Sequence, residues 1–215
     1  MKTKQALVCG ALLIGAALLY ALILYPRLPD LIPIHWNIRG EVDGWAEKRW
    51  AVLMMPGMMT LLVGMMLVLP AMSPRQFRVE SFLSTFNYLM IVCTALMGYI
   101  HLVMLQAALH PELDMGRALI SGIFLFLALT GNVLGRVRRN FWMGVRTPWT
   151  LASDRVWVAT HRLTGRLMVG AGIAGAIAIW LGVPIALCFT LLILALLAPV
   201  VYSYLLYHRW NGDRA

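Results

Sequence analysis

Six long apolar stretches constrain this chain more than any other feature of its sequence. Each stretch is close to the ~20 residues that cross a bilayer as a helix, and its apolar residues follow one another without alternation. A membrane interior satisfies backbone polar groups only in helices or closed barrels. We therefore expect an all-α membrane protein, a bundle of six transmembrane helices. The stretches cover residues 5–25, 50–72, 86–109, 118–135, 167–183 and 185–207.

The amino-acid composition excludes a soluble globular enzyme. Of the 215 residues, 61% are apolar and 13% are charged, whereas an ordinary soluble domain has about 45–50% apolar and about 25% charged residues. Six spans with short connections use the whole length of the chain. Three cysteines, Cys9, Cys93 and Cys188, lie inside apolar stretches without metal or redox spacing. We predict no disulfide, no metal site and no cofactor.

The distribution of Lys and Arg predicts the orientation of the helices. If the N-terminus is cytoplasmic, thirteen of the 18 Lys and Arg residues lie in cytoplasmic segments and five in outer segments. Positive residues concentrate on the cytoplasmic side of membrane proteins. We predict a multi-pass protein of the cell membrane, the bacterial cytoplasmic membrane, with both termini inside. The basic balance then orients the helices and implies no direct contact with nucleic acid.

The first connection, residues 26–49, is patterned enough to be a candidate ligand site on the outer side. Its prolines exclude a helix, and apolar residues alternate from Ile32 to Ile38, which predicts a short extended segment. Two interpretations remain open. The polar side chains contact a ligand, or they bond to one another and to the backbone in a compact cap. The candidate residues are His35, Trp36, Asn37, Gly40, Asp43 and Gly44.

A second informative segment, residues 136–166, carries seven Arg and one Asp and is predicted to face the cytoplasm. Thr147 followed by Pro148 is typical of a helix start. Asp154, Trp157 and His161 have the spacing of one helix face. This basic amphipathic inner segment could bind an anionic partner or lipid headgroups, or could act only as an interfacial anchor, with its tryptophans at headgroup level.

The predicted spans contain no acidic residue, and every Lys and Arg lies at or beyond a span end. Coupled transporters usually need ionisable groups within the membrane, and His101 is the clear one here. The sequence therefore argues against a pump, a coupled carrier or a charge-lined channel. We expect His101 to pair with a polar neighbour on another helix.

Both informative segments resemble the SdpI family of bacterial membrane proteins, whose type member gives immunity to a secreted peptide toxin. The outer segment is similar to the N-terminal domain of unknown function found in that family. Its matching residues are Leu28, Pro29, Ile32, Pro33, His35, Trp36, Asn37, Gly40, Asp43 and Gly44.

The inner segment resembles the C-terminal signature of the same family. Where the family has Arg-Pro-Asn, this chain has Arg138, Arg139 and Asn140. The resemblance implies two units, residues 1–72 with the Pro-rich outer loop and residues 73–215 with the inner signature at 131–166. The residues that it nominates for ligand binding are Asn132, Arg139, Asn140, Gly144, Arg146, Thr147, Trp149, Trp157, Thr160, His161 and Arg162.

The resemblance implies a protein that gives immunity to, or senses, a membrane-active peptide toxin. The implied partners are the peptide toxin, anionic lipids and, as in some members of the family, a cytoplasmic transcriptional repressor. The alternative is a membrane-embedded enzyme that acts on a lipid or peptide. It would use His35 with Asp43, or Asp154 with His161, as an acid–base pair.

Overall fold

The structure is a computed structural model that describes residues 1–37 and 41–211. Its six long helices are each long and apolar enough to cross a membrane, which confirms the predicted bundle. The protein is accordingly a multi-pass protein of the cell membrane. The six helices are α1 (Thr3–Leu24), α2 (Lys48–Ala71), α3 (Leu83–Leu109), α4 (Met115–Leu134), α6 (Asp154–Trp180) and α7 (Ile185–Asn211).

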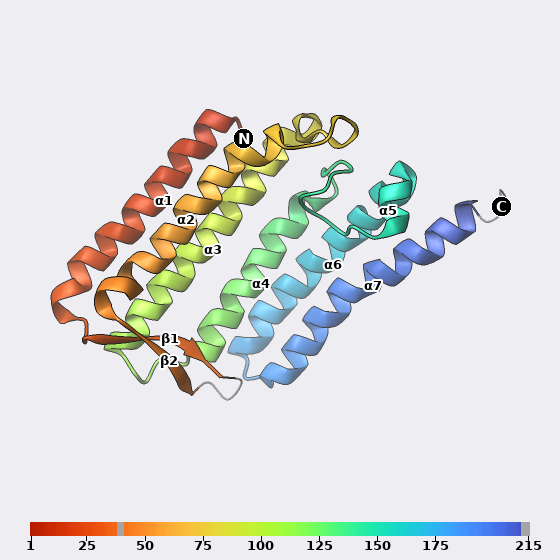
Figure 1. Ribbon diagram of the computed structural model, residues 1–215. Coiled ribbons are helices and arrows are strands. Elements are labelled where there is room, and N and C mark those ends of the chain that lie inside the picture. The colour runs from red at the N-terminus through yellow and green to blue at the C-terminus, as the bar shows by residue number, and fades with distance from the viewer. Residues whose placement is uncertain (38–40, 212–215) are drawn as a thin grey trace.

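The long helices stand side by side in the order in which they follow along the chain (Figure 1). Helix α3 contacts α1, α2 and α4, and α6 lies between α4 and α7. The start of α1 and the end of α7 lie at the same end of the bundle (Figure 1). This agrees with two termini in one compartment, and their location in the cytoplasm remains a prediction.

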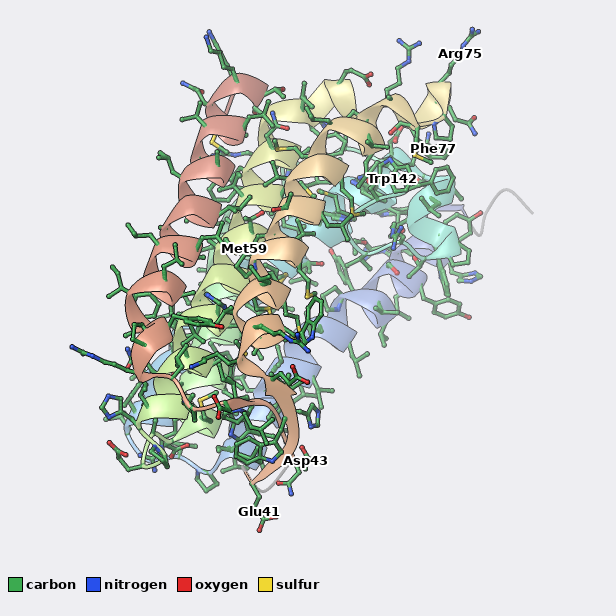
Figure 2. The ribbon with its side chains drawn as sticks, turned by 60° about the vertical axis from the view of Figure 1, so that its left-hand side comes forward. Glu41, Asp43, Met59, Arg75, Phe77 and Trp142 are labelled. Atoms are coloured by element: carbon green, nitrogen blue, oxygen red, sulfur yellow. The ribbon has the colours of Figure 1, made fainter. Side chains whose placement is uncertain are left out.

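Short elements occupy the two ends of the bundle. The strands lie at the end opposite to the start of α1 and the end of α7, and the short helix α5 lies at the same end as these two (Figure 1). The described parts of the first connection, residues 26–37 and 41–49, therefore lie at the opposite end of the molecule from residues 136–153, as the topology predicts. Figure 2 shows Asp43 and Trp142 at these two ends. The short elements are η1 (Tyr25–Arg27), β1 (Leu31–Trp36), β2 (Val42–Glu47), η2 (Arg75–Phe77), η3 (Val79–Phe82) and α5 (Pro148–Ala152).

Strands β1 and β2 form a two-stranded antiparallel sheet. The sheet confirms the extended segment predicted from the alternation, whereas its second strand was not expected. Gly44 lies opposite His35 in the register, and a Cβ atom on Gly44 would be 2.8 Å from the Cβ of His35. A residue without a side chain lets the strands approach at this irregular point of the pairing.

Helices α4 and α6 pack with their backbones unusually close. A Cβ atom on Gly131 would be 2.8 Å from the carbonyl oxygen of Gly165, and a Cβ atom on Gly165 would be 2.6 Å from the carbonyl oxygen of Gly131. Small residues allow such an approach between helices in a membrane, where dispersion contacts take the place of the hydrophobic effect. The contact joins α6 firmly to the middle of the bundle.

Helix α6 begins at Asp154, although the sequence led us to expect the fifth span from residue 167. The Ser153 side chain accepts a hydrogen bond from the amide of Val156 at 3.4 Å and caps the helix. The first three turns of α6 therefore carry part of the basic inner segment. A single helix of 27 residues thus connects that segment with the opposite end of the bundle.

Candidate functional site

The outer hairpin pairs its polar side chains with one another. The imidazole Nδ1 of His35 lies 2.5 Å from Oδ1 of Asp43. Nδ2 of Asn37 donates to Oε2 of Glu41 at 2.8 Å. The pairing agrees with the compact-cap interpretation, yet 69% of the His35 side chain and 44% of the Asp43 side chain are exposed. Both remain accessible to a ligand; Gly40 lies outside the described residues.

The hairpin covers the junction of three helices. Ile34 and Trp36 of β1 lie over a cavity of about 160 Å³, whose floor includes Met55 of α2, Met104 of α3 and Met115 of α4. Flexible methionine side chains adapt readily to a ligand or a neighbour of irregular shape. Trp36 lines this cavity together with residues of the three helices. It therefore links the hairpin to the helices that the hairpin covers.

At the other end, Asn140 holds the backbone of the inner segment in place. Its Oδ1 accepts hydrogen bonds from the amides of Trp142 at 2.7 Å and Met143 at 2.9 Å. Its Nδ2 donates to the carbonyl oxygens of Arg138 at 2.8 Å and Met143 at 3.1 Å. The side chain is fully buried. All of its hydrogen-bonding capacity is used locally, so Asn140 is a positioning residue.

His161 anchors the same segment to α6. Its Nε2 accepts a hydrogen bond from the amide of Val145 at 3.0 Å, and its Nδ1 lies 2.8 Å from the carbonyl oxygen of Trp157. These partners require a neutral ring with its proton on Nδ1. The ring also stacks on Trp157 with a centroid separation of 4.0 Å. Both nitrogens of this buried imidazole are thus bonded to backbone groups.

Gly144 provides the space that His161 occupies. Its φ is +109°, a conformation that L side chains rarely adopt. A Cβ atom at this position would lie 2.2 Å from Nε2 of His161. Trp157 completes the arrangement by donating from Nε1 to the carbonyl oxygen of Val137 at 2.8 Å. Loop and helix are thus held together by two hydrogen bonds between buried aromatic side chains of α6 and the loop backbone, one at Val145 and one at Val137.

Helix α5 is fixed by two hydroxyl groups and by an ion pair. Thr150 Oγ1 accepts from the amide of Thr147 at 2.9 Å, and Thr147 Oγ1 accepts from the amide of Thr150 at 3.2 Å. Thr147 Oγ1 also lies 3.2 Å from the hydroxyl of Ser203 in α7. Nε of Arg139 lies 3.0 Å from Oδ1 of Asp154. Asp154 is therefore paired with an arginine and not with His161.

The nominated inner residues divide into a buried framework and an exposed set. Asn140, Trp157, Thr160 and His161 are buried; Asn132, Gly144, Arg146 and Arg162 are exposed; Arg139, Thr147 and Trp149 are half-buried. Only 1% of Trp157 is exposed, so this tryptophan does not occupy the headgroup level that its sequence position suggested. The buried residues cannot meet a partner directly, whereas the exposed arginines can.

The sequence did not predict a pocket at the end of the bundle that carries the hairpin. A pocket of about 650 Å³ opens between α3, α4 and the end of α6. Its signal in the sequence is the short connection 110–117, in which four ionisable residues, His110, Glu112, Asp114 and Arg117, stand between two apolar stretches. A hydrogen bond from its own backbone, assisted by His110, lowers the pKa of Glu112.

The fold and its two polar ends define a multi-pass α-helical protein of the cell membrane, with a small two-stranded hairpin at one end and a histidine-anchored basic segment at the other. Comparison with known proteins is consistent with this class. The model of a domain of unknown function, DUF1648, matches residues 12–60, and the model of the SdpI/YfhL protein family matches residues 136–203.

The whole chain also has a relative of similar length. It is 27% identical over 209 residues to the "Immunity protein SdpI" of Bacillus subtilis (strain 168), and the match covers 96% of this chain and 98% of the relative. No solved structure matches the chain. These matches support membership of the SdpI family and confirm the resemblance seen in the two informative segments.

Proposed function

We propose that this protein protects the cell whose membrane contains it from a membrane-active peptide toxin. The observation that carries the proposal is the end-to-end similarity to a protein named for immunity, over 96% of this chain and 98% of the relative. The absence of acidic residues from the long helices α1–α4, α6 and α7, apart from Asp154 in the first turn of α6, supports a binding role over ion-coupled export.

The outer hairpin is the proposed first contact with the toxin. Its His35 and Asp43 side chains are accessible, and Trp36 lies between the hairpin and the helices. A peptide that partitions into the outer membrane surface would meet this sheet before it reaches the helices. An exposed imidazole and a nearby indole provide polar and apolar contacts of the kind that dominate peptide recognition.

The basic inner segment is the proposed point of signalling. Its exposed arginines, among them Arg138, Arg146 and Arg162, suit anionic lipids or the acidic surface of a cytoplasmic repressor. Helix α6 begins in this segment and ends at Trp180 beside the outer pocket. A ligand that prefers one arrangement of α6 would shift the population of the inner segment.

Geometry favours binding over the enzymatic alternative. Both nitrogens of His161 are bonded to backbone groups, and Asp154 is paired with Arg139. The predicted Asp154–His161 pair is therefore not formed. His35 and Asp43 do form a pair, but the pair is exposed at the molecular surface. Water screens electrostatic interactions there, and acid–base catalysis depends on such interactions to adjust the proton affinities of the two groups.

Complementation tests the proposal. A strain of Bacillus subtilis 168 that lacks its own SdpI protein is grown together with the parental strain, with and without this chain. We expect the chain to restore survival, and we expect His35→Ala and Trp36→Ala to reduce it. Trp50→Ala is the matched control, since Trp50 is 62% exposed on the first turn of α2.

The outcomes separate the parts of the proposal. If the chain reaches the membrane in normal amount and survival does not improve, immunity is refuted. If survival improves equally with His35→Ala and Trp36→Ala, the protein gives immunity and the hairpin is not the contact.

A further inference from the structure

The pocket between α3, α4 and α6 has apolar walls formed by three helices. Leu102 and Val103 of α3, Leu113, and Trp180 of α6 line it together with the ring of Tyr99. The Tyr99 hydroxyl donates to the carbonyl oxygen of Ala118 at 2.8 Å, which ties α3 to the start of α4. The pocket of about 650 Å³ is large enough for one or more bulky side chains.

Charged residues lie where α3 ends and α4 begins, next to these walls. Asp114 caps α4 by accepting from the amide of Arg117 at 3.0 Å and also pairs with the Arg117 side chain at 3.1 Å. Oε1 of Glu112 lies 3.2 Å from the ring of His110, and 76% of the Glu112 side chain is exposed. The connection at residues 110–117 contains two acidic residues and one arginine, so its formal charge is negative and the Glu112 carboxylate faces solvent.

The wider surroundings of the pocket share this acidic balance. The two connections at this end, residues 25–49 and 110–117, contain six of the nine Asp and Glu residues but only five of the 18 Lys and Arg residues. The rest of the chain contains the other thirteen Lys and Arg residues and only three Asp and Glu residues. A cationic ligand is therefore attracted to the end that contains the pocket and repelled from the other end.

We propose that this pocket binds a cationic amphipathic peptide, with an apolar side chain between Val103 and Trp180 and a neighbouring basic group on Glu112. The proposal deepens the proposed function and rests on it for the identity of the peptide as a toxin. It assigns the deeper contact to the pocket and leaves the hairpin as the first contact. Trp180 ends the helix whose other end holds the inner segment, so an occupant of the pocket touches the element that reaches the cytoplasmic signature.

Binding is measured with the full chain in phosphatidylcholine nanodiscs, and empty nanodiscs report partitioning into lipid alone. The probe is a dye-labelled helical peptide of lysine and leucine, and its counterpart contains glutamate in place of lysine. Val103→Trp fills the pocket and should weaken binding of the lysine peptide by at least about tenfold, since it excludes one large apolar side chain. Glu112→Gln should weaken it about two- to five-fold, as expected of an exposed ion pair.

Matched controls keep the test specific. Leu22→Trp adds an indole to an exposed position of α1, and Glu80→Gln removes an exposed acid from η3, at the other end of the bundle; both should bind the lysine peptide as the unaltered chain does. Glu112→Lys should weaken binding of the lysine peptide and strengthen binding of the glutamate peptide. That reversal cannot come from a loss of folding.

Equal binding by all variants, or equal binding of the two peptides to the unaltered chain, would overturn the pocket assignment. Failure of the pocket does not entail failure of the proposed function, because survival in the complementation assay is scored independently. If Val103→Trp and Glu112→Lys still give full survival, the chain confers immunity by another surface. If the unaltered chain gives none, immunity itself is refuted whatever the peptide data show.

Discussion

Replacing Gly144 with alanine tests the role of His161 as the anchor of the inner segment. The added Cβ would lie 2.2 Å from Nε2 of His161 and 3.0 Å from its Cδ2. To reach an ordinary contact distance, the ring must move by an ångström or more. Such a shift breaks the 3.0 Å hydrogen bond from the amide of Val145. The added methyl group therefore breaks the contact between the loop and His161 of α6.

Two costs add to give the size of the effect. An L residue held at φ +109° costs about 1–3 kcal/mol. Leaving the amide of Val145 and the buried imidazole nitrogen without partners costs about 1–3 kcal/mol more. The segment should lose roughly 2–6 kcal/mol of local stability, with the helices of the bundle intact.

Limited trypsin digestion of the purified protein in detergent measures this local opening. The segment contains Arg138, Arg139 and Arg146 as cleavage sites, and Gly144→Ala should be cut there at least about tenfold faster than the unaltered chain. Gly170→Ala is the control, since a Cβ atom at Gly170 meets nothing within 4 Å.

A double-mutant cycle identifies the mechanism. In a His161→Ala background the steric part of the Gly144→Ala penalty should disappear, which leaves only the backbone strain. If Gly144→Ala is cleaved no faster than Gly170→Ala, or if its penalty is unchanged without the imidazole, the proposed anchoring is wrong.

Three further changes probe the framework. Asn140→Asp replaces the amide donor to Arg138 and Met143 and should open the segment by about 1–3 kcal/mol, seen as faster trypsin cleavage; cleavage at the normal rate would contradict the role of this side chain. Trp157→Phe retains the ring but loses the bond to Val137, so the thermal midpoint in detergent should fall by the equivalent of about 1 kcal/mol; no fall would contradict it. Gly165→Leu should abolish the monodisperse peak on size-exclusion chromatography, because the added Cβ would lie 2.6 Å from the carbonyl oxygen of Gly131. Gly15→Leu is the control and should leave the peak unchanged, because a Cβ at Gly15 meets nothing within 4 Å. Equal recovery of the two variants would argue against close α4–α6 packing.

The helices could be predicted because a bilayer demands about 20 continuous apolar residues, and that demand is visible in the sequence. The start of α6 could not be predicted from the apolar stretch. Residues 154–166 are helical through the Ser153 cap and the burial of Trp157 and His161 against the preceding loop. Such contacts depend on residues up to 20 positions earlier, as with Trp157 and Val137, and periodicity does not report them.

The sites were predicted unevenly for a similar reason. Alternation showed that Ile32 to Trp36 is extended. The partner strand at Val42–Glu47 has no such sequence pattern because Gly44 lies on its half-buried face and Trp45 on its exposed face. The resemblance to a family nominated Asn140 and His161. It did not show that the polar atoms of both side chains form hydrogen bonds with the nearby backbone. The pocket brings α3, α4 and Trp180 together, a juxtaposition that no single stretch of sequence contains.

Thiol labelling across the membrane tests most directly whether the two polar ends lie in different compartments. In a chain with its three native cysteines replaced by alanine, Trp45→Cys and Phe141→Cys each place one thiol at an exposed position of the hairpin or of the inner segment. We predict that a membrane-impermeant maleimide labels position 45 in intact cells and labels position 141 only after the membrane is opened. Labelling of both positions from the same side would contradict the topology, and with it the division between toxin contact and cytoplasmic signalling.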